Sequence, residues 1–180
     1  CLPAHRGEEI TADVFEETMG TSDKVQGIKF IRDGNYYLSK NYKLPKQLCI
    51  MPGQNITICL NGNNLTRGAR VAMVAGTLNI TDCTGTGIVC GEDTANGSTV
   101  KIVAGGTVNL YAGTMTSEAI AAGGGVLNVT QDKGNIAPAD STLPGTFNMY
   151  GGTIRDGASS ADAGNINIWH SSVMNMYGGT

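Results

Sequence analysis

Apolar and polar residues alternate along much of the chain in short runs that end at glycine. The fullest run, residues 145–154, reads Gly-Thr-Phe-Asn-Met-Tyr-Gly-Gly-Thr-Ile. Closely similar copies occupy 106–115 and 173–180, and weaker copies occupy 76–81 and 125–130. Because side chains of a strand point alternately to opposite faces, each copy predicts a short strand with one apolar face. The Asn residues that mark the copies are Asn79, Asn109, Asn128, Asn148 and Asn175.

Every copy has the same parity. In the copy at 106–115, Val108 and Leu110 are predicted to face a core, while Asn109 and Tyr111 face outward. Stacking the copies in register about 4.8 Å apart would place like residues above one another. Outer columns of Asn can then hydrogen-bond along the stack, and Tyr residues can offer an aromatic contact surface. The candidate ligand-surface residues are Tyr111, Tyr150, Tyr177, Asn109, Asn148 and Asn175.

A second apolar run precedes most copies, at residues 71–74, 100–103, 119–122 and 166–169. The stretch 131–143 has no such run, apart from the short Ser141-Thr142-Leu143 segment. An antiparallel sandwich or barrel would also have short strands and glycine turns. Neither fold, however, requires the same inward and outward alternation and the same glycine turn to recur in every copy. The pattern therefore favours an all-β fold, a parallel β-helix (solenoid) in which each coil stacks on its neighbour.

Residues 1–34 do not share the repeat. Ile10, Val14, Phe15 and Met19 fall on one helical face, which predicts a short amphipathic helix over 11–19, and residues 28–31 are typical of a strand. The end of a solenoid exposes unpaired backbone groups and apolar core, so it needs a cover. We therefore expect a small N-terminal cap at 1–34 that contains the helix. Residues 35–180 would form the coils, which we expect to continue beyond the end of this chain.

Composition and charge exclude some classes of partner. The formal net charge is −3, and no basic run with interleaved aromatic residues is present, which argues against binding to nucleic acid. No apolar run reaches the roughly 18 residues that a membrane-spanning helix needs. The 26 glycines fit a chain of many short strands closed by turns.

The chain has five cysteines, an odd number. Cys59 and Cys83 are separated by about one coil, so they are expected on neighbouring strands, where a disulfide, a stacked thiol pair or simple burial would each fit. Cys1 stands where a processed bacterial lipoprotein carries its lipid, although a fragment boundary also explains its position. The cysteine and histidine spacing does not match a metal site, and no cofactor is expected.

Three segments together resemble a known family. They are the run 58–62 (Ile-Cys-Leu-Asn-Gly), the run 78–87 (Leu-Asn-Ile-Thr-Asp-Cys-Thr-Gly-Thr-Gly) and the Met-Tyr-Gly-Gly-Thr copies. The sequence is similar to the right-handed parallel β-helix repeat domains of large secreted or cell-surface proteins of gut Clostridia-type bacteria. This resemblance covers about residues 35–180, and it implies a right-handed, pectate-lyase-like superhelix located outside the cell or on its surface.

Catalytic patterns of the β-helix enzymes are weak in this chain. A hydrolase needs two carboxylates about 5–10 Å apart, and a lyase needs clustered acids for Ca²⁺ with a basic residue. Asp132-Lys133 and Arg155-Asp156 follow their strands at similar places and could form a shallow polar patch, but solvated turns explain them better. His170 beside Trp169 is better explained as a surface residue at a strand end. The candidate acids are Asp82, Glu92, Asp93, Asp132, Asp140, Asp156 and Asp162.

Three functional hypotheses remain. The first is a non-catalytic extracellular structural or adhesive protein that presents a long flat surface to glycans or host proteins. The second is a polysaccharide lyase or glycoside hydrolase. The third is a subunit of a self-assembling filament that associates through open coil ends. The residues favour the first, because a surface built from columns of one residue type leaves little room for a unique catalytic constellation.

Overall fold

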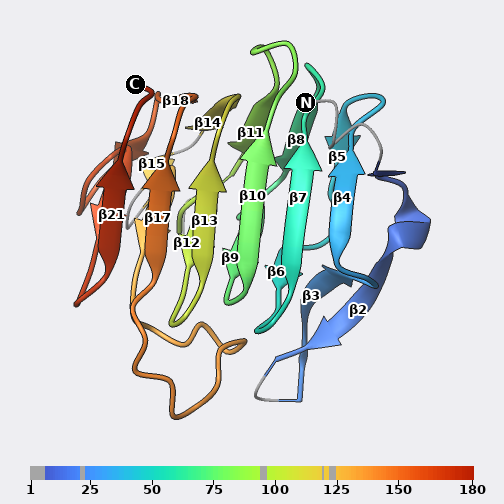
Figure 1. The fold of residues 1–180 in the computed structure, drawn as a ribbon. Coiled ribbons are helices and arrows are strands. Elements are labelled where there is room, and N and C mark those ends of the chain that lie inside the picture. Colours follow the sequence, from blue (N-terminus) through green and yellow to red (C-terminus); the bar gives the residue numbers. More distant parts are fainter. Residues whose placement is uncertain (1–6, 21–22, 94–96, 119, 122–124) are drawn as a thin grey trace.

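A computed structural model describes residues 7–20, 23–93, 97–118, 120–121 and 125–180 (Figure 1). In this part of the chain nearly all regular structure is β-strand, and the strands pair in parallel except for β2 and β3, which are antiparallel. Among the described residues, the one helical element is a short 3-10 helix, η2 (Ala12–Val14).

Sheet A contains Asn79, Asn109, Asn148 and Asn175, and the Tyr residues of the repeat directly follow three of its strands. Figure 1 shows its strands side by side and pointing the same way. In spatial order they are β1 (Glu8–Glu9), β4 (Gly34–Tyr37), β7 (Asn55–Cys59), β10 (Thr77–Thr81), β13 (Thr107–Leu110), β17 (Thr146–Met149) and β21 (Val173–Met176).

Two further sheets lie behind sheet A. Sheet B has the order β2 (Phe15–Met19), β3 (Val25–Phe30), β6 (Leu48–Ile50), β9 (Ala72–Val74), β12 (Val100–Ile102), β16 (Leu127–Val129) and β20 (Ile166–Ile168). Sheet C has the order β5 (Tyr42–Lys43), β8 (Asn64–Arg67), β11 (Ile88–Gly91), β14 (Thr114–Ser117) and β18 (Thr153–Ile154). A small fourth sheet pairs β15 (Ile120–Ala121) with β19 (Ala158–Ser159).

The order of the strands along the chain explains the repeat. From β7 onward the chain passes from sheet A to sheet C, then to sheet B, and returns to sheet A beside the strand that it left. Each return is in register, so that Asn79 of β10 pairs with Asn109 of β13. Nearly all-β structure with parallel sheets visited in this order is compatible with a β-helix-like solenoid.

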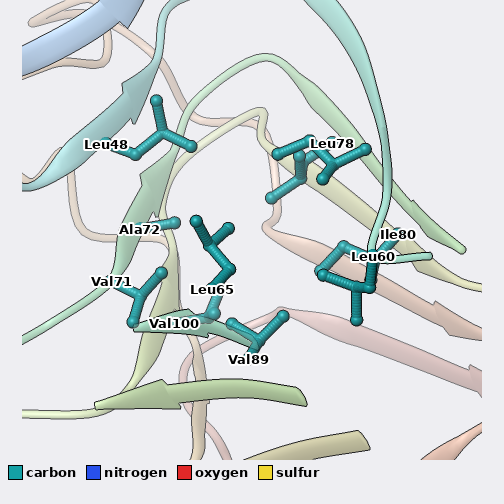
Figure 2. A pocket seen from close by; sticks show the side chains of 10 residues that line it. Leu48, Leu60, Leu65, Val71, Ala72, Leu78, Ile80, Val89 and Val100 are labelled. Carbon is teal, nitrogen blue, oxygen red and sulfur yellow. The ribbon is translucent and has the colours of Figure 1, made fainter. Parts of the chain in front are cut away.

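The inward-facing residues of the three sheets form one apolar core. Val108, Leu110, Phe147 and Met149 are buried, as the parity of the repeat predicts. Figure 2 shows aliphatic side chains of the interior pointing toward one another, and the space left among them is about 10 Å³. That volume is at the lower limit for holding one water molecule. The interior is therefore packed core, and a ligand site has to be sought on the outside.

The helix expected over 11–19 is wrong. After η2 the chain enters strand β2, which pairs antiparallel with β3, and the rings of Phe15 and Phe30 meet with centroids 4.7 Å apart. Ile10 and Val14 are buried as a helical face would require, but Met19 is half exposed. Pairing with β3 gives this segment its hydrogen bonds, so tertiary contacts override the helical spacing. The strand expected at 28–31 is present as part of β3.

The copy at 125–130 does not stack with the other copies. Leu127 and Val129 are buried and Asn128 faces outward, but the strand belongs to sheet B, where Asn128 pairs with Lys101 and Asn167. The parity of a strand is the same in either sheet, so alternation alone could not decide the assignment.

The coil between β14 and β17 also differs from the regular pattern. Of the apolar run at 119–122 the structure describes residues 120–121, which form β15 (Ile120–Ala121) in the small fourth sheet, while residues 119 and 122 lie outside the described part of the chain. The stretch 131–143 contains no strand, so the short strand considered at its end is absent. Instead it carries Ile136 and Ala137, which are buried in a second apolar cluster with Met73 and Val103 of the sheet B region. The extra length of this coil, drawn in orange before β17 in Figure 1, therefore contributes to stability.

Candidate functional site: the outer face of sheet A

The Asn residues of sheet A form a continuous hydrogen-bonded ladder. The Nδ2 atom of Asn148 donates to Oδ1 of Asn109 over 2.8 Å, and Nδ2 of Asn175 donates to Oδ1 of Asn148 over 2.9 Å. Asn109 donates in turn to Asn79 over 2.8 Å. The predicted column therefore exists for Asn109, Asn148 and Asn175, and it extends back to Asn79.

At β7 the ladder ends, because Asn79 contacts both an Asn and a Thr side chain of that strand. Asn79 Nδ2 lies 3.0 Å from Oδ1 of Asn55 and 3.3 Å from Oγ1 of Thr57, its direct partner in the register. In the middle of the ladder, the amides of Asn109 and Asn148 each donate one hydrogen bond to one neighbour and accept one from the other. Because a side-chain amide has two N–H groups and two lone pairs, hydrogen-bonding capacity remains on the half-buried outer surface.

The Tyr residues form a second column beside the Asn ladder. The rings of Tyr111 and Tyr150 are stacked, with centroids 4.9 Å apart and planes inclined by 7°. Tyr150 and Tyr177 continue the stack at 5.1 Å and 11°. Tyr111 and Tyr150 are 47% and 45% exposed, and Tyr177 is 67% exposed. A ligand therefore meets ring edges and hydroxyl groups along most of the column, and it meets a more open ring at Tyr177.

The glycine corner after each Tyr makes this stacking possible. Gly152 has φ +79°, a left-handed conformation that side chains rarely adopt. At Gly151 an added Cβ would lie 2.4 Å from the carbonyl oxygen of Tyr111 on the neighbouring strand. Neither glycine can therefore be replaced without moving the backbone that holds Tyr150 over Tyr111.

A row of Thr residues completes the outer face. Thr77, Thr107 and Thr146 pair with one another in register on the side of the Asn ladder away from the Tyr column, and all three are half-buried. Across β10, β13 and β17 the surface therefore repeats Thr and Asn at the strand spacing, with Tyr following β13 and β17. The face can offer hydroxyl, amide and aromatic edges to a flat or repetitive partner.

The charged residues considered as catalytic candidates lie away from the outer face of sheet A. Asp132 lies 3.5 Å from Nζ of Lys101 and 4.0 Å from Nε2 of His170, whose ring is beside Trp169. Arg155 pairs with its neighbour Asp156 at 3.3 Å. The sequence drew attention to Asp132 and His170 separately, and only the stacking of sheet B brings them together with Lys101.

Asp82 is a structural carboxylate. Burial raises its pKa, but backbone N–H donors from Gly87, Gly62, Thr84 and Gly85 outweigh that effect and hold the pKa below the usual range. The N–H groups of Gly62 and Gly87 lie 2.7 and 2.8 Å from its two oxygens. Asp82 therefore ties the turn after β7 to the loop after β10.

The sulfur atoms of Cys59 and Cys83 lie 3.3 Å apart, as expected for neighbouring strands. This separation is a contact distance and is longer than the roughly 2.05 Å of an S–S bond. The structure thus brings the two predicted residues together without joining them. Cys90 is buried, which raises the pKa of its thiol to about 11, so this cysteine is protonated at neutral pH.

The described residues contain no group of three or more His, Cys, Asp and Glu residues placed to hold a metal ion. Within the same residues, no helix is long and apolar enough to cross a membrane. Comparison with known proteins finds no matching family model, curated protein or solved structure.

Proposed function

We propose that this chain is part of a non-catalytic, extracellular structural or adhesive protein. In this proposal the strands form a right-handed parallel β-helix of the kind found in large bacterial surface proteins, and the outer face of sheet A contacts glycans or host proteins. One observation carries the proposal, the in-register rows of Thr, Asn and Tyr on that face.

The chemistry of this face suits a repetitive partner better than a single small substrate. The Asn amides bind one another and the Tyr rings stack, so both rows are already ordered before a partner arrives. Ordered side chains lose little conformational entropy on binding, which favours affinity from a surface of modest depth. A polysaccharide or an extended protein surface offers many equivalent contacts to such rows.

A polysaccharide lyase or glycoside hydrolase is the second candidate. It is supported by the cluster of Asp132, Lys101 and His170 beside the exposed ring of Trp169. An aromatic platform next to an acid and two basic groups suits a sugar ring and proton transfer. Against this candidate, the Asp132 side chain is 59% exposed, as is typical of an ordinary solvated ion pair.

The two candidates predict different sensitive residues. We would measure binding of the protein to a panel of polysaccharides and extracellular-matrix proteins, and then compare Tyr177→Ala with Trp169→Ala. If binding occurs through sheet A, the dissociation constant of Tyr177→Ala should be about tenfold larger than that of the wild type, equivalent to about 1.4 kcal/mol, and that of Trp169→Ala should change little. The opposite ranking of the two variants would refute the assignment of the binding face.

A further inference from the structure

The strands that carry the Asn and Tyr rows contain no charged residue. Strands β4, β7, β10, β13, β17 and β21 have no Asp, Glu, Lys or Arg, although the chain has 15 acidic and 12 basic residues. Within the strands of sheet A, charge is confined to β1 (Glu8–Glu9) at one edge. Sheets B and C, in contrast, contain Lys101, Lys43 and Arg67. A charged partner therefore finds no complementary charge on these six strands, whereas an uncharged partner meets no unpaired one.

The rows run across the strands of sheet A, which Figure 1 shows side by side. Asn109 pairs in register with Asn148, and the ring of Tyr111 stacks on that of Tyr150. Each step to the next strand therefore repeats the same groups, and the Tyr ring centroids lie 4.9 and 5.1 Å apart. A ligand that uses the rows has to lie across the strands and present like groups at this interval.

The interval between strands discriminates between classes of linear partner. An extended peptide places side chains of one face about 6.6 Å apart, because successive side chains alternate at about 3.3 Å per residue. Such a peptide soon falls out of step with the rows. An extended chain of equatorially linked pyranose rings advances by about one ring length per residue, which is close to the spacing of the Tyr rings. The interval therefore favours a linear polysaccharide over a peptide strand.

The groups on this face suit the surface of a neutral sugar. Beyond their ladder bonds, the amides of Asn109 and Asn148 each retain one N–H and one lone pair. Tyr150 presents a hydroxyl and a ring edge on the exposed side of the row. Sugar hydroxyls both donate and accept hydrogen bonds, and the C–H groups between them are apolar. Uncharged amides beside amphipathic phenol rings can contact both kinds of group.

We propose that the ligand of this face is a neutral β-1,4-linked polysaccharide that lies across strands β10 to β21, with about one sugar residue per strand. These four strands are the ones joined by the Asn ladder. The inference rests on the proposed binding face and narrows its partner to one class of glycan. The rows hold the contact groups in order before binding, so each added sugar residue meets a prepared contact.

Titration calorimetry with neutral β-1,4-linked oligosaccharides of glucose, mannose, xylose and N-acetylglucosamine tests the ligand class. At least one series should bind more tightly with each added residue and stop improving at about four residues, when the ladder is covered. The dissociation constant should change less than about twofold when ionic strength rises from about 0.1 M to about 1 M, because no charge is involved. Failure of all four series to bind, or an affinity that does not depend on length, would overturn the proposal.

A conservative variant tests the contact at the middle of the Tyr row. Tyr150→Phe removes one hydroxyl and keeps the ring stack, so affinity for the oligosaccharide should fall about two- to tenfold while the thermal unfolding temperature stays the same. Tyr42→Phe, in β5 of sheet C, is the matched control and should bind like the wild type. Unchanged affinity in Tyr150→Phe, or an equal loss in Tyr42→Phe, would contradict binding along the row.

The other possible partners of this face give different results. Binding to an acidic polysaccharide or to a protein that Tyr177→Ala weakens, without binding to any neutral series, would overturn the ligand class and leave the binding face in place. Self-association of the protein that oligosaccharide does not reverse would assign the face to a second copy, and it would also overturn the proposal. A wild-type protein that no glycan or protein retains would overturn the binding face itself.

Discussion

Asn148 donates its side-chain amide hydrogen to the side chain of Asn109 on the neighbouring strand, with 2.8 Å between Nδ2 and Oδ1. The same amide accepts a hydrogen bond from Asn175 at 2.9 Å. One residue thus links three strands of sheet A through its side chain, in addition to the backbone pairing. This relationship makes the outer face of the sheet an ordered surface.

The Asn ladder should contribute to stability in proportion to the bonds that each residue makes. Asn148→Ala removes two ladder bonds and should lower the free energy of unfolding by about 2 kcal/mol, because one such bond contributes about 1 kcal/mol. Asn175→Ala removes one ladder bond, the one to Asn148, and should cost about half as much. Urea denaturation of the two variants measures both values, and equal losses would show that the ladder bonds are not what stabilises this row.

The Tyr stack should follow the same rule. Tyr150 contacts a ring on each side, while Tyr177 contacts Tyr150 alone among the described rings. Since a stacked aromatic pair contributes about 0.5–1.5 kcal/mol beyond area burial, Tyr150→Ala should destabilise the protein clearly more than Tyr177→Ala. Thermal unfolding followed by circular dichroism compares them, and a larger loss for Tyr177→Ala would contradict the stacked arrangement.

Asp82 predicts a specific acid sensitivity. Its pKa is held below the usual range in the folded state, so its contribution is fully present above the unfolded pKa of about 3.9 and is lost as pH falls through the folded value. Asp82→Asn should cost about 2 kcal/mol at pH 7, since hydrogen bonds to charged groups contribute about 1.5–3 kcal/mol.

The pH dependence of the Asp82 variant provides the check. Unfolding free energies measured from pH 7 to pH 2 should converge for wild type and Asp82→Asn at the acid end. Asp156→Asn, which alters an exposed acid paired with its neighbour, is a suitable control and should leave the neutral-pH stability almost unchanged. A gap between wild type and Asp82→Asn that stays constant to pH 2 would contradict the assignment.

The repeat predicted the outer face of sheet A better than it predicted the N-terminal segment 11–19 or the strand that contains Asn128. Alternation with a shared corner identified the columns at Asn109, Asn148 and Asn175, because parity and register are local properties of a strand. The same alternation misplaced Asn128, since a strand of sheet B has the same parity. The segment 11–19 shows the other limit, because pairing with β3 and the Phe15–Phe30 contact were invisible in its own periodicity.

The polar clusters depended on distances between coils that the sequence does not contain. Lys101, Asp132 and His170 meet because β12, β16 and β20 are neighbours in sheet B. The variable length of each coil separates such residues by different intervals along the chain, so no fixed spacing marks them.

The loop at 131–143 should be a stabilising element. Ile136 is 4% exposed in the second apolar cluster, whereas Leu143 in the same loop is 62% exposed. Ile136→Ala should therefore cost about 2–4 kcal/mol, and Leu143→Ala should cost less than about 0.5 kcal/mol. Urea denaturation measures both, and a negligible loss for Ile136→Ala would mean that the loop does not pack on sheet B in solution.

The most direct test of the account is one assay with two readouts. The protein is incubated with a panel of neutral and acidic polysaccharides, and both retention on the polysaccharide and release of soluble fragments are measured. We predict that at least one polysaccharide retains the protein, that Tyr177→Ala weakens retention, and that no fragments are released. Fragment release by the wild type that is abolished by Asp132→Asn would contradict the account and would favour an enzyme acting at the Asp132 cluster.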